Sequence, residues 1–249
     1  MKISVVTVSY NAAATIAETL ASVAGQTHED VEHIVIDGGS TDGTHEVIAR
    51  HGAHVARFVS EPDRGIYDAM NKGVALASGE VIGFLNADDR YAHARVLTTV
   101  AAAIEAEDLD AVYGDVAFFQ PDAPLSPVRR YRSSRFSPAR LAWGWMPAHP
   151  ALFMRRRVFQ RVGPFRTDYR IAGDYEFVAR AFRSGQLCYR HLPEVVVHMR
   201  VGGVSTGGLR NTLLLNREVL RACRENGIRT NALMILSKYP MKMLEYLRP

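Results

Sequence analysis

The chain has few cysteines, no long apolar run and no charged tail in its 249 residues. Its two cysteines, Cys188 and Cys223, lie far apart and form no CxxC or Cys/His group of zinc spacing, which argues against a disulfide framework and a structural zinc site. No run reaches the roughly 18 to 20 apolar residues needed to span a bilayer. Residues 1–10 also lack the apolar core and cleavage site of a signal peptide. These absences predict a cytoplasmic protein that is soluble or is held peripherally at the inner face of the membrane.

The composition is that of an ordinary globular protein, with 47% hydrophobic and 22% charged residues, and it favours one large α/β domain. The formal net charge of +4 suits an acidic partner, but the basic residues are spread along the chain. We therefore expect no nucleic-acid partner. A basic nucleic-acid module built on Arg129, Arg130, Arg132 and Arg135 is the weakest alternative.

Strand-like and helix-like segments alternate over the first half of the chain. Thr15-x-x-Glu18 predicts a capping box at the first of the helices, which Gly25 ends. The predicted strands cover 3–8, 31–36, 54–60 and 81–85, and the helices begin near 16, 42 and 66. Such alternation predicts a mostly parallel sheet with helices on both faces.

The pattern loosens after residue 89 and predicts an α+β half that is rich in loops. Helices are expected at 94–105, 175–183 and 209–226, and strands at 111–119, 151–154 and 187–197, with a Pro- and Arg-rich stretch over 120–140. We expect one domain over 1–230, divided into two halves at 1–90 and 91–230. The segment 231–249 is expected to be helical, either packed on the domain or lying at a membrane interface.

Polar clusters follow three of the predicted strands, where ligands collect in parallel sheets. Asp37 comes first, and a carboxylate there can accept the N–H of a base or a ribose hydroxyl. The following turn contains Asp42, which a helix cap explains equally well. Residues 86–89 (NADD) offer hard oxygen ligands that suit Mg²⁺ or Mn²⁺, although an Asp-rich turn would look the same.

Further candidates lie outside these strand ends. Arg64, Asn71 and Lys72 offer cationic and amide groups for phosphate or ribose oxygens. Asp174 lies at the start of a predicted helix, where it could act as a general base or as a plain N-cap. His198 follows an apolar strand. His149, with Trp143 and Trp145, is a candidate for an acceptor groove, and packing explains both tryptophans equally well.

Four motifs resemble those of family 2 glycosyltransferases with the GT-A fold, a Rossmann-like sheet, particularly the bacterial exopolysaccharide and colanic-acid type. They are VTVSYN at 6–11, IDGGSTDGT at 36–44, FVSEPDRGIYDAMNKG at 58–73 and FLNADD at 84–89. Thinner matches follow at Tyr113-Gly114-Asp115, His149-Pro150, Gly163-Pro164-Phe165, 173–176 (GDYE) and His198.

The resemblance implies that 1–90 is the nucleotide-sugar-binding half and 91–230 the acceptor-binding half. It also implies roles for individual residues. Asp174 would be the catalytic base, Asp88 and His198 would hold Mg²⁺ or Mn²⁺, and His149 and Trp145 would contact the acceptor. The nucleotide sugar would contact Tyr10, Asn11, Asp37, Arg64, Asn71, Lys72, Asn86, Ala87 and Asp88. The chain departs from the family at Asn86, in the first position of the DxD motif, and at Gly173, where Glu often precedes the catalytic Asp.

These residues together predict an inverting glycosyltransferase. Its donor would be a nucleotide diphosphate sugar, UDP- or GDP-linked, and its acceptor a hydroxyl of a polysaccharide or lipid-linked glycan in the bacterial cell envelope. One alternative is a sugar nucleotidyltransferase, but residues 9–15 contain neither the glycine nor the lysine of a triphosphate-binding loop. The other is a non-catalytic nucleotide-sugar-binding protein.

Overall fold

The computed structural model describes residues 1–120, 123–202 and 208–240. Nine strands form one sheet in the order β3-β2-β1-β4-β8-β6-β9-β5, with β7 paired to β6. The strands of the first half are β1 (Ile3–Ser9), β2 (Val31–Asp37), β3 (Val55–Ser60) and β4 (Val81–Phe84). They are parallel to one another, as the alternating pattern predicts.

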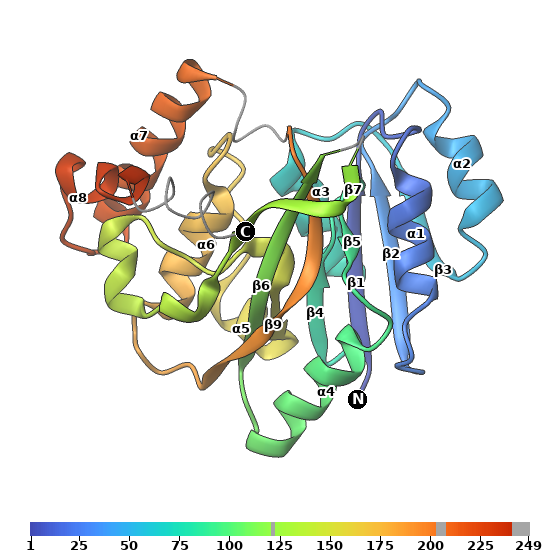
Figure 1. Ribbon diagram of the computed structural model, residues 1–249, viewed down its shortest axis with the longest axis horizontal. Coiled ribbons are helices and arrows are strands. Elements are labelled where there is room, and N and C mark those ends of the chain that lie inside the picture. The colour runs from blue at the N-terminus through green and yellow to red at the C-terminus, as the bar shows by residue number, and fades with distance from the viewer. Residues whose placement is uncertain (121–122, 203–207, 241–249) are drawn as a thin grey trace.

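Two helix layers cover the sheet (Figure 1), and the alternation of side chains along β1 explains why. Val6 and Val8 are buried in a cluster with residues of α3, α5 and α6, whereas Ile3 and Val5 are buried in a cluster with α4. Val35 of β2 packs with α1 and α2 on the same side as α4. The helices are α1 (Ile16–Ala24), α2 (Thr44–His51), α3 (Ile66–Leu76), α4 (Val96–Glu107), α5 (Arg156–Val162) and α6 (Gly173–Phe182).

The second half joins the same sheet through strands of mixed direction. They are β5 (Arg90–Tyr91), β6 (Ala111–Gln120), β7 (Ala123–Tyr131), β8 (Leu152–Arg155) and β9 (Tyr189–Arg200). β8 is antiparallel to β4 and β6, while β9 is parallel to β6. Short 3₁₀ turns lie at Ser133–Arg135, Pro138–Trp143 and His149–Ala151.

The chain from residue 209 onward forms α7 (Leu209–Glu225) and α8 (Ala232–Leu236), which lie together at the end of the molecule opposite α2 and β3 (Figure 1). The predicted helical segment 231–249 is thus seen only as α8, since 241–249 lie outside the described residues. In the part of the chain that is described, no helix has the length and apolar character needed to cross a bilayer.

The structure corrects two expectations. The capping box is wrong, because the Thr15 side chain caps no helix N–H and its Oγ1 instead lies 3.4 Å from the Ala12 carbonyl oxygen. The stretch 120–140 is not loop throughout, because β7 pairs with β6 despite its prolines. Proline is tolerated there because β7 has a strand partner on one side and its ladder is broken by irregularities beside Phe119.

Candidate functional site

The site forms where β1, β2 and β4 end. Ser9 at the end of β1 is paired in register with Asp37 at the end of β2. The chain after β4 continues along β1, since the Ala87 N–H donates to the Val8 carbonyl at 3.3 Å. The expected meeting of these three strand ends at one edge of the sheet is confirmed.

Asp37 is buried and surrounded by hydrogen-bond donors. Its carboxylate accepts the backbone N–H groups of Gly39 and Ser40 at 3.1 and 2.8 Å. The hydroxyls of Ser9, Ser40 and Ser60 and the His45 imidazole also lie at 2.5–2.9 Å from its oxygens. Burial alone would raise the pKa of Asp37, but the bonds from Ser40, His45 and Ser60 outweigh burial and hold that pKa far below its usual range. Asp37 is therefore a permanent anion that orders the turn after β2.

The residues beside Asp37 form an open shelf. Tyr10 is 68% exposed, and its ring lies against Gly38, where a Cβ would approach Tyr10 Cδ2 to 3.4 Å and Asp63 Oδ2 to 2.6 Å. Asn11 has a positive φ of 48° and makes two hydrogen bonds to the turn. Its backbone N–H donates to Ser40 Oγ, and its Oδ1 accepts the Thr41 N–H. The exposed Tyr10 ring offers a flat face for a nucleobase, whereas Asn11 shapes the shelf.

Asp42 has a structural role in the turn before α2. Its Oδ1 accepts the backbone N–H of Thr44, the first residue of α2, and its Oδ2 accepts that of Ala13, both at 3.1 Å. The N-cap of α2 is Gly43, so Asp42 bonds the turn without being the cap residue itself.

Three residues that were expected to contact the nucleotide sugar bond to other residues of the protein in this structure. Arg64 is exposed and pairs with Asp68, and Lys72 pairs with Glu61 at 2.8 Å. Asn71 bonds both the N–H and the carbonyl of Phe165 at 2.8 Å. Arg64 lies within the 61–65 loop, and Lys72 contacts Glu61 of that loop. Asn71 links α3 to the second half of the chain. Their contacts with a nucleotide stay predictions.

The NADD turn after β4 holds an unusual polar atom. Asn86 donates its amide to Asp89 Oδ2 at 3.1 Å, but its Oδ1 is buried and has no hydrogen-bond partner within the described ranges. Asp88 is exposed, whereas Asp89 is only 2% exposed. Burial raises the pKa of Asp89 well above its usual value, and the charge of Asp88 adds to that shift. Ala87 is buried and lies between the two polar groups.

His198 is placed beside this turn by the pairing of β5 with β9. It lies opposite Arg90, two residues beyond Asp88, and its ring packs 4.5 Å from that of Phe119. Burial lowers the pKa of His198 to about 4, and the positive charges of Arg90 and His93 act in the same direction. Its imidazole is therefore neutral at pH 7, which is the form that binds a metal.

These residues fit a divalent cation that is shared with a ligand. Among residues 1–120, 123–202 and 208–240, no group of three His, Cys, Asp or Glu side chains is arranged to hold a metal. Mg²⁺, however, is commonly bound by one or two carboxylates plus substrate phosphates, and Mn²⁺ prefers similar oxygen ligands. The Asp88 carboxylate and the unpaired Asn86 oxygen are oxygen donors of this kind, and the neutral His198 imidazole adds a nitrogen donor. The donor set fits a cation that needs phosphate oxygens to complete its coordination.

Asp174 is the second residue of α6 and is largely buried. The N-cap is Ala172, so Asp174 is not the plain cap that its position allows. Its Oδ1 accepts the Tyr175 N–H at 2.8 Å and lies 3.4 Å from the Tyr67 hydroxyl. Burial raises the pKa of Asp174, and His149 and these two bonds offset the rise only in part. Such a carboxylate has a strengthened affinity for a proton.

His149 connects Asp174 to the strand ends. Its ring stacks on Phe84, the last residue of β4, with centroids 5.1 Å apart. Burial lowers the pKa of His149, and the charge of Asp174 partly opposes this effect. The ring contact therefore places His149 at the end of β4 that leads into the NADD turn, and the charge of Asp174 acts on His149 there.

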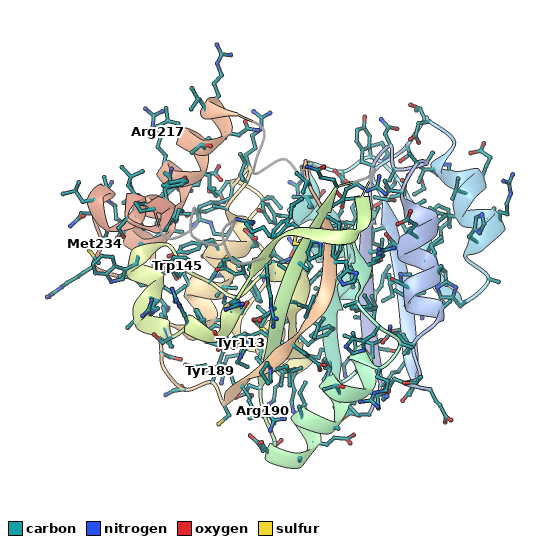
Figure 2. All side chains as sticks on the ribbon, viewed as in Figure 1. Tyr113, Trp145, Tyr189, Arg190, Arg217 and Met234 are labelled. Atoms are coloured by element: carbon teal, nitrogen blue, oxygen red, sulfur yellow. The ribbon has the colours of Figure 1, made fainter. Side chains whose placement is uncertain are left out.

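The two tryptophans differ in exposure. Trp145 is 8% exposed and stacks on Tyr131, at the end of the molecule that carries α7 and α8 (Figure 2). Trp143 is 45% exposed. The contact of Trp145 with an acceptor stays a prediction, and in this structure its ring serves packing.

Two residues that the sequence did not single out contact the segment before Asp174. They are Tyr67, in the first turn of α3, and Glu218, in α7. Tyr67 lies within the motif at 58–73, but the sequence does not predict its contact with the segment before Asp174. Nothing in the local pattern of α7 marks Glu218, because its partners lie 46 to 48 residues away in the chain.

Comparison with known proteins adds a family. The model of the family described as "Glycosyl transferase family 2" matches residues 4–163. The PGL/p-HBAD biosynthesis glycosyltransferase of Mycobacterium tuberculosis is 35% identical over 226 residues, which cover 88% of this chain and 82% of that protein. A further M. tuberculosis protein, named an uncharacterized glycosyltransferase, is 35% identical over 181 residues, 72% of this chain and 68% of its own length.

Solved structures show the same fold. TarS of S. aureus superposes with a TM-score of 0.70 at 19% identity over 100% of this chain, which spans only 44% of TarS, and a shorter form of TarS has been solved with UDP-GlcNAc. The mannosyltransferase PcManGT from Pyrobaculum calidifontis, solved with GDP-Man and Mn²⁺, gives a TM-score of 0.63 at 21% identity, over 88% of this chain and 64% of that one. The GT-A fold expected from the sequence is confirmed.

Proposed function

Because this chain belongs to glycosyl transferase family 2, we propose that it moves a sugar from a UDP- or GDP-linked donor to a hydroxyl of a polysaccharide or lipid-linked glycan precursor, with inversion at the anomeric carbon. That TarS and PcManGT have been solved with UDP-GlcNAc and GDP-Man supports a donor of this class. The role in cell-envelope assembly belongs to the same proposal.

Asp174 is the general base of the proposed reaction. It takes the proton of the acceptor hydroxyl while that oxygen attacks the anomeric carbon. The bond between this carbon and the diphosphate oxygen breaks, and the nucleoside diphosphate leaves with the electron pair. The raised pKa of Asp174 suits this task, since a base is most effective when its pKa approaches the working pH.

The other residues bind and orient the donor. The Tyr10 ring stacks on the nucleobase of the donor, and the turn ordered by Asp37 and Asn11 receives the nucleoside. Arg64 and Lys72 approach the diphosphate. Asp88 and His198, with the unpaired Asn86 oxygen, would hold Mg²⁺ or Mn²⁺. A bound cation supplies positive charge that stabilises the departing diphosphate.

One observation carries the proposal. A largely buried carboxylate of raised pKa, Asp174, interacts electrostatically with His149, whose ring stacks on Phe84 at the end of β4, the strand that leads into the NADD turn. A single displacement requires a base and a cation site at one catalytic centre, and the proposal assigns these roles to Asp174 and the NADD turn.

Contact with a membrane is proposed for the α8 end. Leu233 is 81% exposed and Leu236 is 47% exposed, and apolar side chains in this position support a peripheral contact that would bring a lipid-linked acceptor to the site.

The test is a thermal-shift screen of nucleotide sugars with and without Mn²⁺, followed by product analysis. We expect one UDP- or GDP-sugar to raise the melting temperature, more so with Mn²⁺, because a ligand that binds only the folded state stabilises it by mass action. With an acceptor, NMR should show nucleoside diphosphate and a glycoside of inverted configuration. Pyrophosphate among the products, or retained configuration, would contradict the proposal.

A further inference from the structure

The backbone that leads into α6 is held by a single carboxylate. Three consecutive N–H groups, those of Arg170, Ile171 and Ala172, each donate to Glu218 at 2.8 Å. Glu218 is 8% exposed and belongs to α7, so a helix near the C-terminal end of the described chain fixes the three residues that precede Gly173 and Asp174. Bonds to an ionised carboxylate are the strong kind of hydrogen bond, and they hold this segment tightly.

The same segment is held from the opposite side by the first half of the chain. The Tyr67 hydroxyl donates to the Ile171 carbonyl at 2.6 Å and lies 3.4 Å from Asp174 Oδ1. Ile171 is therefore bonded through its N–H to Glu218 and through its carbonyl to Tyr67. This one residue joins α3 to α7.

Gly173 allows Tyr67 to approach. A Cβ at this position would lie 2.6 Å from Tyr67 Cε2, so no larger residue fits while the ring stays in place. Tyr67 is 5% exposed, which leaves its ring little room to move aside. The glycine that departs from the family's usual Glu is thus explained by the tyrosine ring that packs on it.

We infer that Glu218 and Tyr67 form a clamp on residues 170–174 that sets the position of the Asp174 carboxylate, so that both are positioning residues for the transfer reaction. The inference rests on the proposed role of Asp174 as the base. Proton abstraction requires a near-attack distance to the acceptor oxygen, and a misplacement of about 1 Å can lower the rate about 100-fold. A clamp that bonds the backbone before Asp174 from two helices holds that distance.

The principal test is Glu218→Gln. The amide has one acceptor oxygen where the carboxylate has two, and its NH₂ group faces backbone donors, so the segment loosens. We expect kcat to fall about 10- to 100-fold while the KM for the donor changes less than about twofold. A loosened Asp174 becomes better solvated, so the acidic limb of the kcat profile should move to lower pH, which simple loss of folded protein would not cause.

Glu225→Gln is the matched control. Glu225 lies on the same helix and bonds the same neighbourhood, through the Tyr169 hydroxyl at 2.7 Å and Arg166, but no contact joins it to the backbone of residues 170–172 among the described residues. This variant removes the same charge from α7. It should lower the melting temperature and leave kcat and its pH profile unchanged.

Tyr67→Phe serves if Glu218→Gln fails to fold. It keeps the ring against Gly173 and removes only the hydroxyl, and we expect kcat to fall a few-fold. Because the hydroxyl lowers the pKa of Asp174, its loss should move the acidic limb to higher pH, opposite to the shift in Glu218→Gln. If the folded variants keep the wild-type kcat and acidic limb, the clamp is refuted.

Asp174→Asn, measured in parallel, separates this inference from the proposed function. If Asp174→Asn keeps full activity, the base assignment fails, whatever Glu218 does. If Asp174→Asn is inactive and the clamp variants behave as wild type, only the clamp fails. In a double variant, Glu218→Gln should lower the residual kcat of Asp174→Asn no further, because the base it positions is already gone.

Discussion

Asp37 and Asp174 are both largely buried carboxylates, but their surroundings give them opposite properties. Asp37, at the end of β2, is surrounded by two backbone N–H groups, three hydroxyls and an imidazole, and its pKa is depressed. Asp174, at the start of α6, has two donors nearby, and its pKa is raised. The number of hydrogen-bond donors around a buried carboxylate thus decides whether it is a fixed anion or a base.

The largest effect that this contrast predicts concerns catalysis. Asp174→Asn should lower kcat by about 10²- to 10⁴-fold, because the amide cannot accept the proton of the acceptor hydroxyl. Calorimetric titration should give an unchanged Kd for the donor, since the chemistry and not donor binding is lost. Equal losses of kcat and donor affinity would assign Asp174 a role in donor binding and would contradict its contrast with Asp37.

The next effect concerns stability. In Asp37→Asn the NH₂ group would face Ser and His donors in a buried site, and we expect the free energy of unfolding to fall by about 3 kcal/mol. Urea denaturation measures this change. Asp42→Asn is the control from the same turn, and because Asp42 is exposed, its urea midpoint should fall much less. Equal midpoint shifts for the two variants would show that burial of the Asp37 carboxylate is unimportant.

The smallest effect is a separation of two pH dependences. The depressed pKa of Asp37 contributes stability that is fully present above its unfolded value near 3.9 and is lost only as pH falls through the lower folded value. The raised pKa of Asp174 has the opposite sign, since protonation of this residue favours the folded state.

On acidification, kcat should therefore decline about tenfold per pH unit below the pKa of Asp174 while the fold persists. A pH–rate profile recorded beside circular dichroism tests this expectation. Coincident loss of activity and structure would remove the distinction between the two carboxylates.

The first half of the chain was predictable to within a few residues because its signals are local. β-branched strands alternate with amphipathic helices, and parallel strands then bring Ser9, Asp37 and Asn86 to one edge. The second half was less predictable. The pairing of β7 with β6 and the short helix α5 depend on partners elsewhere in the fold, and prolines and arginines conceal them.

The site was predictable in its residue types but not in its environments. The motifs marked Asp88, Asp174 and His198, and the metal and nucleotide contacts at these residues stay predictions. The motifs did not predict the unpaired oxygen of Asn86 or the hydrogen bond of Asn71 to Phe165, which lies 94 residues away.

The sequence by itself determined the parallel sheet, the family and the carboxylates available for chemistry, because periodicity, turn residues and short motifs are written in neighbouring positions. Only the tertiary structure decided which carboxylate has a depressed pKa and which has a raised one, and which side chains bond the backbone before Asp174. The Tyr67 hydroxyl lies 104 residues from its partner at Ile171, and Glu218 lies 47 residues from the same partner. A pKa and a hydrogen bond depend on what surrounds a group in space, and folding supplies those surroundings from distant parts of the chain.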